Sequence, residues 1–303
     1  MRKKSKLISD ITESCRRWDC SMDGFAVKCI LADFLDRVGI LDRELKRLNR
    51  KYANNYIRIV NYHTSPEAER HLFQNQVEWF LERFENCDME KMASFLRGES
   101  VFREKPGIIF TFDDGFLENY QVAHQVLKEQ NATGWYMVSS GFVGQQNHQS
   151  HNGCHDYMTA EQLRTILADG GVIGCHTYSH HRMDINDTEE TLFHEIVEAK
   201  SQLQKLTGTE INLFCWCGGE EETYTQKAAE LIRSAGYTYA FMTNSEVIRP
   251  DTNRFQMDRS NIEASWPISL VKFQICGLMD YRFSGKRRRV HKLTGEIDDE
   301  KSN

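Results

Sequence analysis

The chain has 303 residues, of which 40% are hydrophobic and 27% are charged, a composition typical of a soluble globular protein with a substantial core. Its formal net charge of -6 excludes a general nucleic-acid-binding protein, which would need a basic surface. Disorder along the whole chain is also excluded, because Phe, Leu, Ile and Val recur throughout the sequence.

Nine cysteines without a regular spacing favour a reduced, cytosolic protein over a disulfide framework. The first residues are basic, but no apolar stretch precedes Cys15, so we expect no secretory signal. No window approaches the roughly 20 apolar residues that a membrane-spanning helix needs. The sequence therefore predicts a cytoplasmic location, with the inner face of the membrane as the alternative.

Residues 24–50 are predicted to form one amphipathic helix, within an N-terminal helical extension that covers residues 1–55. Its apolar stripe could pack on the main domain, on a second subunit or on a membrane surface. Basic runs within residues 2–6 and at residues 286–289 are interpreted as solvated tails, the second being part of a basic and then acidic tail at 286–303. Contact with anionic lipid head groups is the alternative.

Between residues 56 and 285, short apolar runs alternate with helical patterns, which indicates a parallel sheet. Seven runs are predicted to be strands, at 57–62, 107–112, 133–138, 172–175, 213–217, 237–242 and 255–259. The sequence has no glycine-rich phosphate motif, and this favours a closed barrel over an open nucleotide-binding sheet. We therefore predict an α/β fold, a distorted (β/α) barrel of about seven parallel strands.

Two carboxylates end one of these strands, where Asp113 and Asp114 precede Gly115. In a parallel barrel, functional residues collect at the C-terminal ends of the strands. Gly115 permits a turn, so that one carboxylate can bind a cation while its neighbour faces a reacting water. For this motif taken alone, a plain Asp-Gly turn is the alternative.

His176 and His180 follow another strand and are four residues apart, so that on one helical turn both imidazoles reach the same side. Neutral imidazole is a preferred zinc ligand, and two histidines with one carboxylate leave coordination positions open for water. Together with Asp114, the two histidines predict such a metal site.

Residues 111–115 (Thr-Phe-Asp-Asp-Gly) and 176–180 (His-Thr-Tyr-Ser-His) together resemble the two leading motifs of the NodB-like polysaccharide deacetylase family, carbohydrate esterase family 4. Residues 157–163 (Tyr-Met-Thr-Ala-Glu-Gln-Leu) are also typical of it. The resemblance covers about residues 57–277. Either leading motif alone would not be specific, but the two together are.

The resemblance implies that Asp114, His176 and His180 bind one divalent metal ion. Zn²⁺ is favoured, and Co²⁺, Ni²⁺ and Fe²⁺ share such ligands. Asp113 would be the general base for a metal-bound water that attacks an amide carbonyl. Thr111 and Ser179 would position the backbone and the ligands.

Two departures from the family pattern affect the remaining roles. Most members supply a late histidine as general acid, and this chain has none on its late strands. Because a barrel is circular, His63 at the end of the first strand is predicted to replace it, as in relatives that resemble rearranged poly-N-acetylglucosamine deacetylases. A strand-end histidine that only bonds a loop is the alternative. The arginine of the third motif is also missing, and Arg259 could replace it or form a structural ion pair with Asp258.

Trp216 and Trp266 are predicted, with Arg259, to contact substrate, since sugar rings pack on aromatic faces; a place in the core is the alternative for both tryptophans. Cys215 and Cys217 are interpreted as small buried residues rather than a metal pair. The loop from His148 to His155 is expected to be a polar lid or a mobile loop, and a second metal site is the less favoured option.

The predicted function is removal of the N-acetyl group from an amino-sugar unit of a glycan or glycan precursor. O-acetyl ester hydrolysis and a catalytically silent sugar-binding protein are the alternatives. The expected partner is an N-acetylated carbohydrate, with a lipid-linked or nucleotide-linked precursor of a cell-surface glycan favoured by the expected location. Peripheral membrane contact is a further expectation, and nucleic acid is not a partner.

Overall fold

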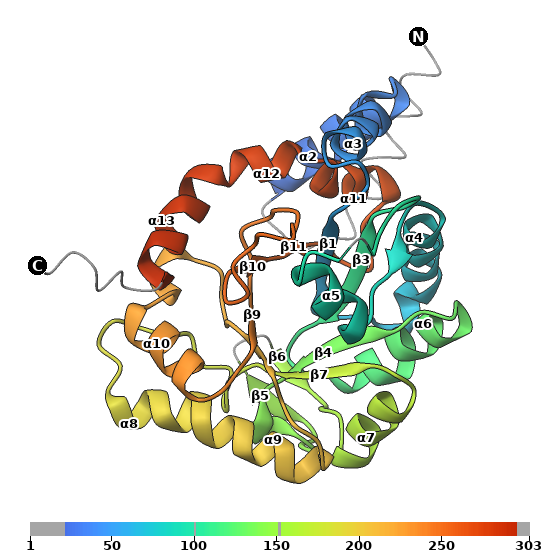
Figure 1. Cartoon of the computed structure of the whole chain (residues 1–303). Helices are drawn as coiled ribbons and strands as arrows, with labels where there is room; N and C mark the ends of the chain where they lie inside the picture. Colours follow the sequence, from blue (N-terminus) through green and yellow to red (C-terminus); the bar gives the residue numbers. More distant parts are fainter. Residues whose placement is uncertain (1–21, 100, 151–152, 296–303) are drawn as a thin grey trace, which may run out of the picture.

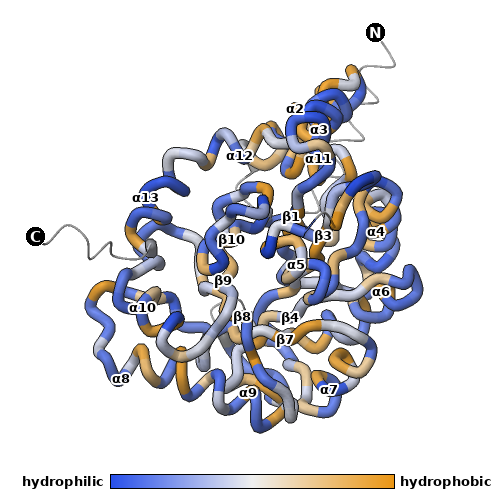
Figure 2. Tube along the Cα trace, in the orientation of Figure 1, coloured by the Kyte–Doolittle hydropathy of each residue, from blue (hydrophilic) through white to orange (hydrophobic). Residues whose placement is uncertain are grey.

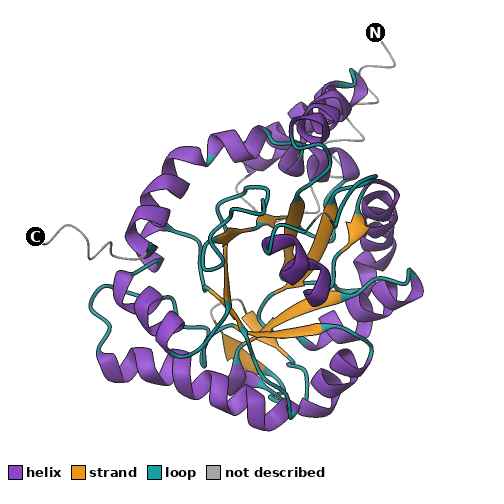
Figure 3. Cartoon of the chain, in the orientation of Figure 1, coloured by secondary structure: helices purple, strands orange, loops and turns teal. Residues whose placement is uncertain are grey.

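The structure is a computed structural model that describes residues 22–99, 101–150 and 153–295. At its centre, parallel strands run in the order β10-β9-β8-β7-β4-β3-β1-β11 inside a ring of helices (Figures 1 and 3). A short strand, β2 (Glu85–Asn86), pairs with the beginning of β3. The first six strands of the barrel in chain order are β1 (Ile57–Tyr62), β3 (Gly107–Phe112), β4 (Gly134–Val138), β7 (Val172–Cys175), β8 (Leu213–Cys215) and β9 (Tyr239–Met242).

The barrel closes through one interrupted strand. β10 (Met257–Asp258) pairs with β9 at one end of the strand order, and β11 (Ser260–Asn261) pairs with β1 at the other end. Only Arg259 separates them, so the chain changes its pairing partner at this residue. Counted together, the two pieces make seven strands, and the predicted distorted (β/α) barrel is confirmed. The last strand lies at 257–261 and not at 255–259.

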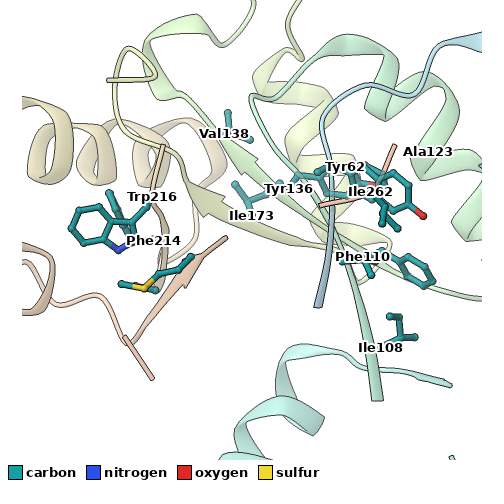
Figure 4. Packing of buried hydrophobic residues seen from close by; sticks show 14 of the residues in the cluster. Tyr62, Ile108, Phe110, Ala123, Tyr136, Val138, Ile173, Phe214, Trp216 and Ile262 are labelled. Atoms are coloured by element: carbon teal, nitrogen blue, oxygen red, sulfur yellow. The ribbon is translucent and has the colours of Figure 1, made fainter. Parts of the chain in front are cut away.

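All residues of β1, β3, β4, β8 and β9 are buried, because alternate side chains point into the barrel and toward the helices. One hydrophobic cluster includes Ile59, Ile109, Trp135, Met137, Leu213 and Phe241. A second cluster packs the same strands against the helices and includes Tyr62, Phe110, Tyr136, Val138, Ile173 and Phe214 (Figure 4). Both faces of the sheet are therefore part of the core.

Helix α5 (Met89–Leu96) covers one end of the barrel. It contributes Phe95 to the first cluster, and Phe102, which follows it, packs beside Gly107 at the start of β3. The covered end is therefore the one where the strands begin, and the opposite end holds the C-terminal strand ends.

The remaining helices surround the sheet, with hydrophobic and hydrophilic positions mixed along each of them (Figure 2). They are α4 (Arg70–Arg83), α6 (Gln125–Glu129), α7 (Ala160–Ala168), α8 (Glu189–Leu192), α9 (Ala199–Thr207), α10 (Gln226–Ser234), α11 (Ile268–Ile275), α12 (Leu278–Arg282) and α13 (Ser284–Thr294). Two π-helical segments, η2 (Asn119–His124) and η4 (Phe193–Glu198), run directly into α6 and α9. Three short 3-10 turns are η1 (Glu67–Glu69), η3 (Ser140–Phe142) and η5 (Glu221–Thr223).

The single helix predicted for residues 24–50 is wrong. The segment forms two helices, α2 (Met22–Arg37) and α3 (Ile40–Lys51). Gly39, with a φ of 73°, separates them, because a residue in the left-handed region ends one helix before the next begins. Within the described residues, no helix combines the length and the apolar character needed to cross a membrane.

The C-terminal basic run is also not a solvated tail. Residues 286–289 lie in α13, and Arg287 is buried. Its Nη1 donates to the carbonyls of Asn244 and Ser245, and its Nε pairs with Glu246 at 3.0 Å. The basic run within residues 2–6 and residues 296–303 lie outside the described residues, and the proposed domain boundaries stay a prediction.

Replacing Phe95 by Ala should lower the free energy of unfolding by about 3–5 kcal/mol, because a fully buried ring would leave a cavity in the barrel. Urea denaturation measures this change. The control is Phe193→Ala, whose ring is 50% exposed and whose loss should cost less than about 0.5 kcal/mol. Equal losses in the two variants would contradict the assignment of α5 as the cover of the barrel.

Candidate active site

The strand that carries the two carboxylates ends in a strained turn. Asp114 has a φ of 70° and Gly115 a φ of 83°, so two successive residues occupy the left-handed region. A Cβ atom at Gly115 would lie 3.1 Å from the side chain of Val138, which leaves little room for another residue. This turn splits the neighbouring carboxylates, and Asp113 continues the ladder by donating its N–H to the carbonyl of Tyr62.

His176 and His180 flank a turn and not the helical turn expected from their spacing. Thr177 and His180 have φ values of 61° and 57°, which breaks helical geometry at both ends of the segment. A β-branched residue in this region is unusual, and such strain clusters at functional sites. The two imidazoles still meet, with ring centroids 4.9 Å apart.

The three predicted metal ligands come together. His180 Nε2 lies 3.0 Å and His176 Nε2 lies 3.6 Å from Asp114 Oδ1. Ligand atoms in a tetrahedral site with bonds of about 2.0–2.1 Å lie roughly 3.3–3.4 Å apart. The donor types therefore suit a divalent cation, and the two distances to Asp114 Oδ1 lie on either side of this spacing.

The neighbourhood also sets the protonation state of the ligands. His176 Nδ1 lies 3.0 Å from the carbonyl oxygen of Cys215, which can only accept, so Nδ1 carries the proton and Nε2 faces Asp114. Burial lowers the pKa of His176 to about 4, which keeps the ring neutral at pH 7. Burial raises the pKa of Asp114, but the imidazoles of His180 and His176 outweigh it and hold that pKa well below its usual range.

Two thiols lie beneath this cluster. Among the described residues, two groups of candidate ligand atoms lie within 4.8 Å of one another, and each includes a thiol: His176–His180–Cys217 and Asp113–His176–Cys215. Burial raises the pKa values of both Cys215 and Cys217 well above the ordinary range, so both are neutral thiols. They match the prediction of small buried residues.

Asp113 is held by Arg259 through two hydrogen bonds, from Nη1 to Oδ1 at 2.7 Å and from Nη2 to Oδ2 at 2.8 Å. Both side chains are almost fully buried. Burial raises the pKa of Asp113, but the guanidinium and His176 outweigh it, so the pKa is lowered and the carboxylate is ionised. Arg259 thus makes the contact with Asp113 that the sequence analysis considered for it. Asp258 pairs with His291 instead, at 2.8 Å.

His63 lies beside the carboxylates at the end of β1. Its Nδ1 is 3.6 Å from Glu263 Oε1, and its side chain is 36% exposed. Burial lowers its pKa, but the nearby carboxylate of Glu263 and the charges of Asp113 and Asp114 outweigh it and raise the pKa to about 9. The ring is therefore protonated at neutral pH.

These groups open into one cavity of about 650 Å³ at the C-terminal ends of the strands. Asp113, His63, His176 and His180 line it, and Asn61 and Asn261 add amide groups from the two strands that close the barrel. The other lining residues are Thr64, Phe116, His155, Arg182, Gly218, Gly219, Glu220, Thr243, Glu263, Phe283 and Lys286.

The predicted substrate-binding set is not confirmed. Trp216 is buried under the helices, where it packs against Phe214 and Tyr224, because it lies on the outer face of its strand end (Figure 4). Trp266 packs against Phe25 of α2, with Lys28 over its ring, and is not among the residues that line the cavity. Arg259 is buried below the cavity and contacts Asp113.

The loop from His148 to His155, which was expected to be a polar lid or a mobile loop, contains two paired strands, β5 (His148–Ser150) and β6 (Gly153–His155). His155 reaches the cavity and stacks on Phe116 with ring centroids 4.1 Å apart, whereas His148 packs on Phe142. In the described part of the chain, no group of candidate metal ligands includes these histidines. His151 lies outside the described residues.

Two supporting residues were missed by the sequence analysis, and both come from the π-helical segments. Glu195 of η4 is buried and accepts hydrogen bonds from the N–H groups of Tyr178 and Ser179, each at 2.9 Å, and from the Ser179 hydroxyl. Asn119 of η2 donates to the carbonyl of His63 at 2.9 Å. Each π-helical segment therefore holds one loop of the site in place. No local sequence motif predicts either Glu195 or Asn119.

Residues 102–240 match the family model described as polysaccharide deacetylase. These residues, somewhat less than half of the chain, are similar to the polysaccharide deacetylase family. The match includes both aspartates and both histidines of the site but neither His63 nor Arg259. The predicted resemblance to this family is thus confirmed over these residues.

The relatives are distant. YxkH of Bacillus subtilis (strain 168), assigned by name to the polysaccharide deacetylases, is 22% identical over 191 residues, and the alignment covers 63% of each chain. The chain thus spans less than two thirds of that relative. Among solved structures, IcaB from Ammonifex degensii is 20% identical with a TM-score of 0.60, covering 72% of this chain and 95% of that one. A de-N-acetylase from Aggregatibacter actinomycetemcomitans is 16% identical with a TM-score of 0.60, covering 73% and 100%. At these identities, the structures establish the fold.

Replacing Glu195 by Ala should weaken metal binding about 10- to 100-fold, because the loop between His176 and His180 loses three hydrogen bonds to a buried carboxylate. Titration with Co²⁺ followed by visible absorption measures the affinity. Glu198→Ala is the matched control, since Glu198 lies in the same segment, is exposed and, among the residues that the structure describes, pairs only with His194. Unchanged affinity in the Glu195 variant would show that the loop is held by other contacts.

Proposed function

We propose that the protein is a metal-dependent hydrolase that removes the N-acetyl group from an amino-sugar unit of a glycan or glycan precursor. One observation carries this proposal: the Asp113 carboxylate, held by Arg259, and the imidazole of His63 line the same cavity as His176 and His180, whose Nε2 atoms face Asp114. A base and an acid beside a cation site are the groups that hydrolysis of an amide needs.

Each residue has a defined task in this reaction. A divalent cation bound by Asp114, His176 and His180 would polarise the amide carbonyl and lower the pKa of a bound water. Asp113 accepts a proton from the attacking water, with Arg259 fixing its orientation. The water oxygen bonds to the carbonyl carbon, and the C–N bond then breaks as His63 gives its proton to the departing nitrogen. The products are acetate and a free amine.

The protonated His63 supports the amide over an ester as substrate, because an amine leaving group depends on protonation more than an alkoxide does. O-acetyl ester hydrolysis uses the same water attack and is the second candidate. A catalytically silent sugar-binding protein is disfavoured, because binding alone does not require a buried base that is held ionised by an arginine.

The same proposal extends to the metal, the form of the substrate and the location of the protein. Two imidazoles and one carboxylate favour Zn²⁺, and Co²⁺, Ni²⁺ and Fe²⁺ can share these ligands. The seven cysteines in the described part of the chain are free thiols, which supports a reducing compartment. A cytoplasmic enzyme would meet a lipid-linked or nucleotide-linked precursor of a cell-surface glycan.

The direct test is acetate release from a panel of N-acetylhexosamine substrates, from monosaccharides to oligosaccharides, measured by mass spectrometry. Removing metal with a chelator should abolish release, and Zn²⁺ should restore it. Asp113→Asn should lower the rate by about 10²–10⁴-fold, because proton transfer to the base is lost. Release from O-acetylated sugars alone would identify an esterase, and release that survives in the Asp113 variant would refute the assigned base.

The pH profile tests the role of His63. The protonated ring is the active form, so the rate should fall as pH rises through its pKa, which Glu263 helps to raise. Replacing Glu263 by Gln removes that negative charge, so the alkaline limb of kcat/KM should move to lower pH. His63→Ala should remove the limb and leave the metal content unchanged. A limb that persists in the His63 variant would assign the acid to another group.

A further inference from the structure

The outer face of α2 is apolar and exposed. The apolar stripe of α2 consists of four residues of the helix and Val38, which follows it, with exposed fractions of 62% for Val27, 47% for Ile30, 44% for Leu31, 59% for Phe34 and 51% for Val38. Apart from Gly24 and Arg37, every exposed residue of α2 with a described side chain is large and apolar. Such a continuous patch marks a binding surface and not a solvated one.

The opposite face of α2 is already occupied. Cys29 and Ala32 are buried against Leu270 of α11, and Lys28 donates to Gln274 at 3.1 Å. Lys272 of α11 pairs with Asp36 at 2.8 Å. The helix is therefore fixed to the barrel through one side, and the apolar stripe takes no part in this packing.

Helix α3, which packs against α2, carries exposed positive charge. The basic face of α3 consists of exposed cations, which are Arg43, Lys46, Arg47, Arg50 and Lys51. Its two acids are already engaged, since Glu44 lies near Arg43 and Arg47, and Asp42 pairs with Lys272. Neither Lys46 nor Arg50 forms an ion pair with any residue that the structure describes. In Figure 1, the two helices project together from the ring of helices.

We propose that the apolar stripe of α2 and the basic face of α3 together bind an anionic lipid surface. Apolar side chains of such a helix enter the boundary between head groups and acyl chains. Lysine and arginine side chains beside it are attracted to anionic lipid head groups, and the two signals together give stable peripheral binding. The inference is independent of the deacetylase chemistry, because it uses none of the residues of the cavity.

Charge argues against the other occupants of this surface. A second copy of the chain docked stripe to stripe would bring two basic faces of α3 close together, and like charges across an interface are unfavourable. Residues 1–21, which precede α2, contain six Lys and Arg residues against three Asp and Glu residues, so they would repel the same face. Anionic lipid, in contrast, complements both helices and this segment.

The experiment is co-sedimentation of the full-length protein with vesicles of pure phosphatidylcholine or of phosphatidylcholine with about one third phosphatidylglycerol. Binding to the anionic vesicles should be at least about tenfold stronger and should weaken as salt is added. Equal binding to both vesicle types, or no binding to either, would overturn the proposal.

Matched variants assign the surface. Ile30→Glu and Phe34→Glu should each lower the vesicle partition coefficient by about tenfold or more, whereas Ile185→Glu, at a residue that is 77% exposed elsewhere, should leave it unchanged. Lys46→Glu with Arg50→Glu should remove the preference for anionic lipid, and Lys227→Glu on α10 is the control. Thermal unfolding should be unchanged in all of these variants, because the replaced side chains are exposed.

Two further outcomes would replace the lipid by another occupant. A concentration-dependent dimer in sedimentation velocity that Ile30→Glu abolishes, without vesicle binding, would assign the stripe to self-association. Vesicle binding that is lost on deletion of residues 1–21 but retained in both stripe variants would assign the contact to that segment and refute the role of α2.

Discussion

Two adjacent carboxyl groups at a buried strand end require compensation by positive charge, and this requirement organises the site. Asp113 and Asp114 cannot both ionise in such a place unless each has its own partner. Arg259 supplies a bidentate partner for Asp113, and the imidazoles of His176 and His180 face Asp114. The strained backbone at Asp114 keeps the two carboxylates apart, so that one is reserved for a cation and the other for a proton.

The sequence was most informative where chemistry and local pattern coincide. The seven strands, the two motifs and the meeting of Asp114 with His176 and His180 could all be predicted, because strand ends of a parallel barrel share one edge. His63 was placed in the cavity by the circular order of the strands. The break at Gly39 and the burial of Trp216 could not be predicted, because helix periodicity and aromatic character do not reveal which face the fold covers.

The supporting residues show a different limit of sequence analysis. Glu195 and Asn119 have no motif, and each becomes important only because a π-helical turn directs it at a loop that carries site residues. Extra residues in such turns shift the register of a helix, and they occur often at functional sites. The same device is used on both sides of the cavity, once for the loop of His63 and once for the loop between the two histidine ligands.

The interrupted strand at Arg259 has a consequence for how this protein can change. One residue marks the point where the sheet returns to its first strand, and the same residue holds the base in its charged form. A substitution of Arg259 therefore affects both the charge of the base and the closure of the barrel. We therefore expect sequence drift to be rare at this position, and engineering for greater heat resistance to begin elsewhere in the chain.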